Sequence, residues 1–385
     1  MRLKFLRHVL PALLATGAVL LAGSTPALAS TPAHRGSGPG GMDPALRTQI
    51  DAFANATVGT NGITGVIVGI HDPAKGDLLT AYGDADRAGT PMRANMHYRI
   101  ASVTKTFTAT AVLQLAEKRK LSLDDRLDTY VPNIPRGRQI TLRDLLDMRS
   151  GLYDYATDPA VYAAYQKNPL MPGFTIDSAL KVIRAHPGTA PGQKAEYNNS
   201  NYLLLGLVME KVTGEPAPAT IERLARRSGL GSTTFPTTPD MPKPYAHGYL
   251  LPTDPGPNRD VTRSSMIYPY TAGAVVSTVP DMLRYAEQLG TGYGLSRSTF
   301  RDRTDWVPLT GTGVRLQYGL GILQVGDWIG HDGSIFGYSD VVSYLPSAKA
   351  SVVVMVNASN ADAVTSTDLW GKIVTLLHPD SLPTW

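Results

Sequence analysis

This sequence is organised around one stretch, YRIASVTKTFTATAVLQLAEK, residues 98–118. From Thr104 to Lys118 the apolar residues recur at helical spacing, which predicts a core helix beginning just after Ser102. Ser102 and Lys105 are three residues apart, so such a helix brings the hydroxyl and the amine to the same face. The two side chains can therefore touch.

A serine hydroxyl beside a lysine amine can carry nucleophilic catalysis. The hydroxyl is a weak nucleophile until a base takes its proton, and lysine serves as that base only where its pKa is lowered. A helix N-terminus adds partial positive charge where an oxyanion would form. The spacing alone is a weak signal, because Ser178 and Lys181 repeat it in a polar stretch that reads as a solvated helix face.

A second motif, Tyr197-Asn198-Asn199, is the only Y-x-N in the chain and precedes another helical pattern. A phenol between serine and lysine can act as general base when the cation keeps it partly ionised, and afterwards as acid to the leaving group. The carboxamide of Asn199 can orient the lysine and bind a substrate amide. The alternative is a packed tyrosine ring followed by asparagines that cap the next helix.

The third motif is His331-Asp332-Gly333, followed by Ser334, at the head of a predicted strand. A glycine at a strand edge lets a substrate backbone approach closely. The backbone N–H of Ser334 can then complete an oxyanion hole with that of Ser102. The alternative is a simple hydrogen-bonded turn at His331 and Asp332.

The two ends of the chain carry strand patterns and the middle carries helical ones. Strands are predicted at 63–70, 78–82, 316–325, 328–329, 337–345 and 351–356, and helices at 44–53, 201–212 and 362–377. Short turns between successive strands favour antiparallel pairing. We therefore predict an α/β fold in which 43–120 and 258–385 form one antiparallel sheet flanked by helices. A mainly helical domain, 121–257, is inserted, with a site between the two parts.

The first 29 residues are typical of a secretory signal peptide. Arg2, Lys4 and Arg7 precede an apolar run, and Ala27-Leu28-Ala29 provides a cleavage site. We expect a secreted or extracytoplasmic protein with no membrane attachment after cleavage, and a disordered leader at 30–42 that is rich in Gly, Pro and Ser.

Composition excludes several kinds of function. The chain has no cysteine, so a thiolate nucleophile, a disulfide framework and a zinc-thiolate site are ruled out. Removing the three basic signal residues from 36 Lys and Arg leaves 33, against 32 Asp and Glu. A nearly neutral mature chain without a basic run interleaved with aromatics gives no support for a nucleic-acid partner.

Taken together, four segments in this order resemble the serine β-lactamase and D-alanyl-D-alanine carboxypeptidase superfamily, and most closely its class C and secreted DD-peptidase branch. The segments are 98–107, 145–155 (LLDMRSGLYDY), 197–202 (YNNSNY) and 330–333 (GHDG). In that branch Y-x-N takes the place of S-D-N, and H-x-G can replace K-T-G. The resemblance runs from about Asp43 to the last predicted helix.

The resemblance implies the penicillin-binding-protein fold, an acyl-enzyme on Ser102 and no metal or cofactor. By position it makes Lys105 and Tyr197 the proton-transfer pair. It assigns substrate binding to four residues: Asn199, His331, Gly333 and Ser334. The expected partner is a small substrate, either a peptide such as a cell-wall peptide, an ester or a β-lactam. We expect the enzyme to be a monomer.

Some positions depart from the family pattern. Asp332 stands where threonine or serine is usual and adds negative charge where a substrate carboxylate would be bound. Residues 318–324 (YGLGILQ) lack the arginine that DD-carboxypeptidases use for that carboxylate. We expect a D-alanyl-D-alanine carboxypeptidase-type peptidase. The alternatives are a β-lactamase-related esterase, a D-amino-acid amidase, or a β-lactam-binding protein with little turnover.

Overall fold

The computed structural model describes residues 41–251, 258–311, 316–359 and 365–382. The expected signal peptide, 1–29, and residues 30–40 of the expected leader lie outside this range. The last leader residue, Met42, is buried in the core, so that part of the expectation is wrong. Asp43 caps helix α1 (Pro44–Thr57) as predicted, accepting hydrogen bonds from the N–H groups of Ala45 and Leu46.

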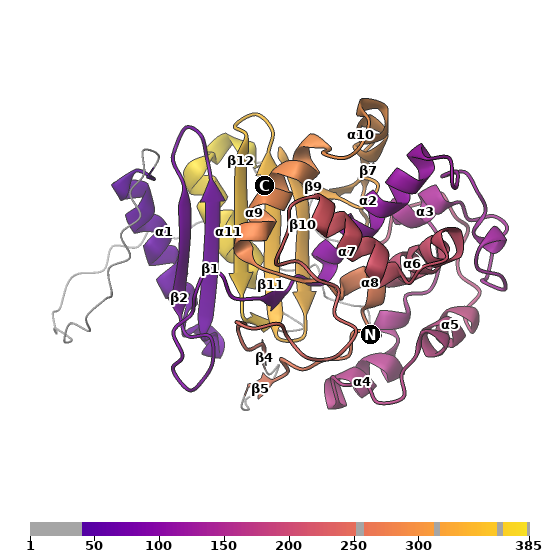
Figure 1. Cartoon of the computed structure of the whole chain (residues 1–385), viewed down its shortest axis with the longest axis horizontal. Coiled ribbons are helices and arrows are strands. Elements are labelled where there is room, and N and C mark those ends of the chain that lie inside the picture. Colours follow the sequence, from indigo (N-terminus) through magenta and orange to yellow (C-terminus); the bar gives the residue numbers. More distant parts are fainter. Residues whose placement is uncertain (1–40, 252–257, 312–315, 360–364, 383–385) are drawn as a thin grey trace.

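One antiparallel sheet of eight strands dominates the fold (Figure 1), and both ends of the chain contribute to it. In spatial order its strands are β2 (Leu78–Gly83), β1 (Gly65–His71), β12 (Ala350–Val356), β11 (Tyr338–Leu345), β10 (Trp328–Ile335), β9 (Leu323–Val325), β8 (Leu316–Tyr318) and β7 (Val307–Pro308). The two ends of the chain meet where β1 pairs with β12, with Val66 opposite Val356. The predicted sheet is thus confirmed.

Helices cover both faces of this sheet. Helix α9 (Val279–Thr291) packs on one face, and α1 and α11 (Thr365–Leu377) pack on the other (Figure 1). Strand β1 shows the consequence, because Ile67 points into the core on the α9 side while Val66 and Val68 point into the core beneath α1 and α11. A strand covered on both sides needs apolar residues at every position, which explains the continuous run that predicted it.

The remaining helices gather beside the sheet (Figure 1). They are α2 (Thr104–Glu117), α3 (Leu142–Leu146), α4 (Pro159–Lys167), α5 (Ile176–Arg184), α6 (Asn199–Thr213), α7 (Ala217–Arg227), α8 (Tyr270–Gly273) and α10 (Arg297–Arg303). Helix α2 packs against α6, α7 and α8. Helices α2 and α8 belong to this group, although both lie outside residues 121–257. The division of the chain into a sheet domain and a helical domain inserted at 121–257 therefore remains a prediction.

Two strand expectations need correction. The predicted strand 316–325 is divided into β8 and β9, because the chain turns at Gly321, whose φ of 77° suits glycine. Strand β10 extends to Ile335, so His331 and Gly333 lie within the strand and not at its head. Pairing with β11 keeps this glycine-containing segment extended although it has little strand propensity of its own.

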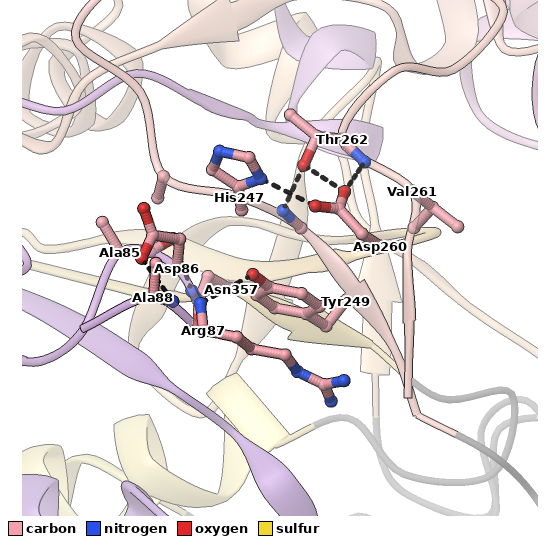
Figure 2. Close-up of polar contacts among 12 residues, drawn as sticks. Ala85, Asp86, Arg87, Ala88, His247, Tyr249, Asp260, Val261, Thr262 and Asn357 are labelled. Atoms are coloured by element: carbon pink, nitrogen blue, oxygen red, sulfur yellow. Dashed lines mark hydrogen bonds and ion pairs between the residues drawn. The ribbon is translucent and has the colours of Figure 1, made fainter. Parts of the chain in front are cut away.

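A small second sheet is formed by β13 (Ala358–Ser359), β4 (Tyr249–Leu250) and β5 (Arg259–Asp260). Figure 2 shows the polar contacts around it: His247 Nδ1 lies 2.7 Å from an Asp260 carboxylate oxygen, and the other oxygen accepts from Thr262. The Arg87 N–H donates to the Tyr249 hydroxyl at 3.1 Å. The contacts of Asp260 join the two sides of the β4–β5 hairpin, and the Arg87 contact attaches the hairpin to the segment that follows β2. None of the helices in the described ranges has the length and apolar character needed to cross a membrane.

Candidate active site

Ser102 lies in a single 3₁₀ turn, Ala101–Val103, that connects strand β3 (Tyr98–Arg99) to helix α2. Ala101 has a φ of 43°, in the left-handed region that a residue with a Cβ avoids. Such a conformation costs on the order of 1–3 kcal/mol and persists only where the surrounding structure holds it. The sharp turn leaves Ser102 half-buried at the start of the helix.

Lys105 is fully buried one turn further along α2. Its Nζ lies 2.9 Å from Ser102 Oγ, 2.8 Å from Asn199 Oδ1 and 2.9 Å from the carbonyl oxygen of Ala272. Burial lowers the pKa of Lys105 to about 7, although the carboxylates of Asp154 and Asp332 act in the opposite direction. The amine can therefore both release and accept a proton near neutral pH.

Tyr197 completes the contact around the serine. Its phenol forms a hydrogen bond with the Ser102 side chain, and Lys105 Nζ lies 4.8 Å from the centre of its ring. Burial raises the pKa of Tyr197 well above its usual value, and the nearby Asp332 raises it further. The phenol is accordingly protonated at neutral pH. Of the two groups that contact Ser102, the lysine is the one suited to act as base.

His331 lies close to this group, but its side chain is fully buried. Its Nε2 is 3.2 Å from the Tyr318 hydroxyl, and its Nδ1 is 2.6 Å from the backbone oxygen of Asp332. Burial lowers the pKa of His331 to about 3, and the positive charge of Lys105 adds to this effect. The imidazole is therefore neutral, and in this structure it does not present a positive charge to a substrate.

The rest of the third motif borders the turn that carries Ser102. A Cβ on Gly333 would lie 2.6 Å from the carbonyl oxygen of Ile100 and 2.8 Å from the carboxylate of Asp340, so only glycine allows β10 to approach this closely. The Asp332 side chain is 34% exposed, and partial burial raises the pKa of its carboxyl. Ser334 is exposed. Solvent thus reaches the side chain of Asp332 and not that of His331.

Sequence reasoning missed the role of Asp154. Its Oδ2 accepts a hydrogen bond from Asn199 Nδ2 at 3.0 Å, and its Oδ1 accepts one from the N–H of Ala156. Asp154 therefore orients the carboxamide whose oxygen faces Lys105. The residue lies inside the segment 145–155 that carried the family resemblance, but no local pattern indicates that it contacts Asn199, 45 residues away.

The second S-x-x-K pair has a structural explanation. Ser178 forms a reciprocal capping box with Thr175 at the start of α5, and Lys181 is exposed on the same helix. The expectation that this pair has no part in the site agrees with that placement.

Comparison with known proteins gives a consistent result. The Beta-lactamase family profile matches residues 50–374. Among solved structures, a D-stereospecific amidohydrolase from Streptomyces sp. superimposes with a TM-score of 0.76 at 28% identity, covering 88% of this chain and 99% of that one.

Two curated proteins are similar in sequence. PbpX of Bacillus subtilis, named as a candidate penicillin-binding protein, is 26% identical over 294 residues, which is 74% of this chain and 69% of PbpX. Esterase EstB of Burkholderia gladioli is 31% identical over 194 residues, about half of either chain (46% and 48%). Because the family profile covers most of its length, this chain belongs to the Beta-lactamase family.

Proposed function

We propose that this Beta-lactamase-family serine hydrolase cleaves small amides and esters through an acyl-enzyme on Ser102. The observation that carries the proposal is the 2.9 Å contact between Lys105 Nζ and Ser102 Oγ, at a place where burial brings the pKa of the amine to about 7. A nucleophile in contact with a base of matched pKa is the arrangement that acyl transfer needs.

The hydrogen-bond partners of Lys105 define the direction of proton transfer. The neutral amine has two protons and one lone pair. Asn199 Oδ1 and the Ala272 carbonyl oxygen can only accept hydrogen bonds, so each accepts one from the two N–H groups of the neutral amine. The lone pair then faces Ser102, the one partner with a proton to give. Lys105 is thus oriented as the general base.

In the first half-reaction, Ser102 Oγ forms a bond to the substrate carbonyl carbon while its proton moves to Lys105. The backbone N–H groups of Ser102 and Ser334 receive the oxyanion. The protonated Tyr197 donates to the leaving amine or alcohol as the C–N or C–O bond breaks, and it recovers a proton from Lys105. Water then attacks the ester, with the same groups acting in reverse.

Among acyl donors, we rank D-aminoacyl amides and esters first. His331 is neutral and buried, and the group beside it that solvent partly reaches is Asp332, so a substrate carboxylate would meet negative charge. An uncharged or cationic substrate avoids that repulsion. The likeness to the Streptomyces amidohydrolase supports this ranking.

A D-alanyl-D-alanine carboxypeptidase-type activity, which the sequence analysis placed first, is the second candidate. It is supported by the Tyr197-Asn198-Asn199 motif and by the likeness to PbpX. This candidate needs a cation for the terminal carboxylate, and His331 does not provide one. It therefore ranks below amide hydrolysis.

One assay separates the candidates. The protein is incubated with D-alanine amide, L-alanine amide, a short acyl ester and an acylated peptide ending in D-Ala-D-Ala, and ammonia, acid and D-alanine are measured. Faster release from D-alanine amide supports the first candidate, and faster release of D-alanine from the peptide supports the second. No turnover of any of the four would contradict both.

Intact-mass measurement after incubation with penicillin provides the second test. An acyl adduct that is absent in Ser102→Ala identifies the nucleophile, and an adduct that persists without turnover favours the binding-protein alternative. We further propose that the chain is exported. Mass analysis of the protein recovered from culture medium should then show an N-terminus at Ser30.

A further inference from the structure

Tyr318 is a fully buried tyrosine beside the active site, and the acyl-transfer steps give it no part. It lies on β8, where its backbone pairs with Val307 of β7 on one side and with Leu323 of β9 on the other. A side chain on a paired strand is held more firmly than one on a loop. The centre of its ring is 6.2 Å from that of Tyr197, so a rigid element supports a residue of the site.

The Tyr318 hydroxyl determines how the His331 ring is held. His331 Nδ1 is 2.6 Å from the carbonyl oxygen of Asp332, which can only accept, so Nδ1 carries the proton of the neutral ring. Nε2 then has a lone pair, and the Tyr318 hydroxyl donates to it at 3.2 Å. The Tyr202 hydroxyl is a more distant neighbour of Tyr318, at 3.5 Å, and gives its own proton to the Leu146 carbonyl. Both nitrogens of His331 are thus engaged, which fixes its ring.

Tyr197 needs support from its neighbours, because it is only half-buried and lies in the loop just before α6. Lys105 Nζ lies over its ring, 4.8 Å from the centre. Tyr318 meets the ring edge-on at 81°, and the His331 ring is centred 6.1 Å away. Tyr318 and His331 also meet edge-on, at 5.8 Å and 88°. Edge-to-face contact is a favoured geometry for aromatic pairs, so the three rings form one packed group.

We propose that Tyr318 is a positioning residue for the general acid Tyr197. Its hydroxyl orients His331, and the two rings together hold the Tyr197 phenol where it reaches the leaving group. Because Tyr318 is fully buried, it acts through these rings and not by contact with substrate. The inference rests on the proposed function, since it requires Tyr197 to donate the proton that the leaving group takes.

The leaving group distinguishes a misplaced acid from a general loss of structure. Ammonia leaves D-alanine amide only with a proton from the acid, whereas the p-nitrophenolate of D-alanine p-nitrophenyl ester leaves without one. Tyr318→Phe keeps the ring and removes the hydroxyl. We expect it to lower kcat/KM about tenfold for the amide and less than about twofold for the ester. Tyr318→Leu removes the ring as well and should widen this difference.

Tyr338→Phe is the matched control. Tyr338 is also a fully buried tyrosine of the large sheet, and its hydroxyl donates to the Ala246 carbonyl at 2.9 Å. This variant should leave the ratio of amide to ester activity unchanged. Thermal unfolding shows that each variant is folded at the assay temperature. An equal effect of Tyr318→Phe on both substrates, or the same change of ratio in Tyr338→Phe, would overturn the proposal.

Tyr197→Phe separates this inference from the proposed function. It removes the acid itself, so it should lower amide hydrolysis about 100-fold and affect the ester far less. A selective loss in Tyr197→Phe without one in Tyr318→Phe would refute the positioning role and leave the proposed function standing. Equal losses of both substrates in Tyr197→Phe would contradict the acid step, and the positioning role would fall with it.

Nitrogen NMR of protein isotope-labelled at histidine measures the hydrogen bond without a substrate. The Nε2 signal of His331 is identified by its absence from His331→Gln. It should move downfield in Tyr318→Phe, toward the position of a nitrogen with a free lone pair, and stay in place in Tyr338→Phe. An unmoved signal in Tyr318→Phe would refute the contact on which the proposal depends.

Discussion

Lys105 illustrates how a single residue acquires its chemistry from its surroundings. Its amine is held by Ser102 from its own helical turn, by Asn199 at the start of α6 and by the Ala272 carbonyl of α8. These three contacts fix the position of Nζ, and the burial that they require removes water from it. Desolvation disfavours the ammonium form, which is why the pKa falls to about 7.

The pH dependence of acylation follows from this pKa. Lys105 must be deprotonated to accept the serine proton, so we expect the acylation rate to be low at acidic pH, to rise through an inflection near pH 7 and to level off above it. The measurement is kcat/KM for an ester substrate between pH 5 and 9. Lys105→Ala should be severely impaired across the whole range. A profile for the native enzyme that is flat through pH 7 would contradict the role of Lys105 as base.

Asp154 provides a second prediction at this scale. Its negative charge raises the pKa of Lys105, opposing the effect of burial. Asp154→Asn should therefore move the inflection to lower pH. We also expect a loss in kcat of about tenfold or more, because Asn199 is held less firmly in its orientation.

Asp158→Asn is the matched control for Asp154→Asn. Asp158 is a nearby carboxylate that caps α4 through the Ala160 and Val161 N–H groups and does not contact Asn199. This control should leave the pH profile in place. An inflection that moves upward in Asp154→Asn, or moves equally in both variants, would show that Asp154 does not act on Lys105.

At the scale of elements, the decisive feature is the close approach of strand β10 to the turn that carries Ser102. Gly333 permits it, because the nearest atoms on either side belong to the Ile100 carbonyl and to the buried Asp340 carboxylate, directly opposite on β11. The Ile100 carbonyl belongs to the backbone, and the Asp340 side chain is fully buried, so neither neighbour has free space into which it can move. The strand and the turn are therefore held at a separation set by the absence of a Cβ.

Gly333→Ala should disrupt this contact. We expect a loss of about 1–3 kcal/mol in the free energy of unfolding, as for other overpacking substitutions, together with a large loss of acylation rate. Thermal unfolding and ester hydrolysis measure the two effects. Gly371→Ala on α11 is the control, since a Cβ there meets no atom within 4 Å and alanine favours the helix by roughly 1 kcal/mol. If Gly333→Ala were as stable and active as the control, the close packing would be unimportant.

Elements differed in how far local sequence predicted them. Helix α2 and the β1–β2 hairpin follow from local apolar patterns, and α6, which spans Asn199–Thr213, contains the helix predicted at 201–212. Helix α9 was not predicted, although Thr278 caps its N-terminus. The limits of β10 were also wrong, because its last residues are extended through pairing with β11 and not through their own propensity.

At the scale of the whole molecule, the two ends of the chain are joined across β1 and β12. Asn357, just after β12, is fully buried and connects the two strands at this junction. Its Oδ1 accepts a hydrogen bond from the Gly65 N–H at 2.8 Å, and its Nδ2 donates one to Thr64 Oγ1 at 2.7 Å. Figure 2 shows Asn357 close to the segment that follows β2. One side chain thus connects positions 292 residues apart.

Asn357→Ala should weaken the entire fold. It leaves the Gly65 N–H buried without an acceptor, which costs about 1–3 kcal/mol in the free energy of unfolding. Denaturant unfolding measures this loss. Asn258→Ala removes a comparable but exposed hydrogen bond, to the Gly62 carbonyl, and should change stability by less than about 0.5 kcal/mol. Similar losses in both variants would mean that burial at the junction does not matter.

The sequence by itself determined the features that depend on near neighbours. Ser102 and Lys105 share a helical face because a spacing of three residues requires it, and alternation and turns were enough to predict one antiparallel sheet from both ends of the chain. Only the tertiary structure decided the state of the groups in the site. The lowered pKa of Lys105, the neutral form of His331 and the contact of Asp154 with Asn199 all depend on burial by distant segments. Desolvation is a property of the assembled fold, so no local pattern can encode it.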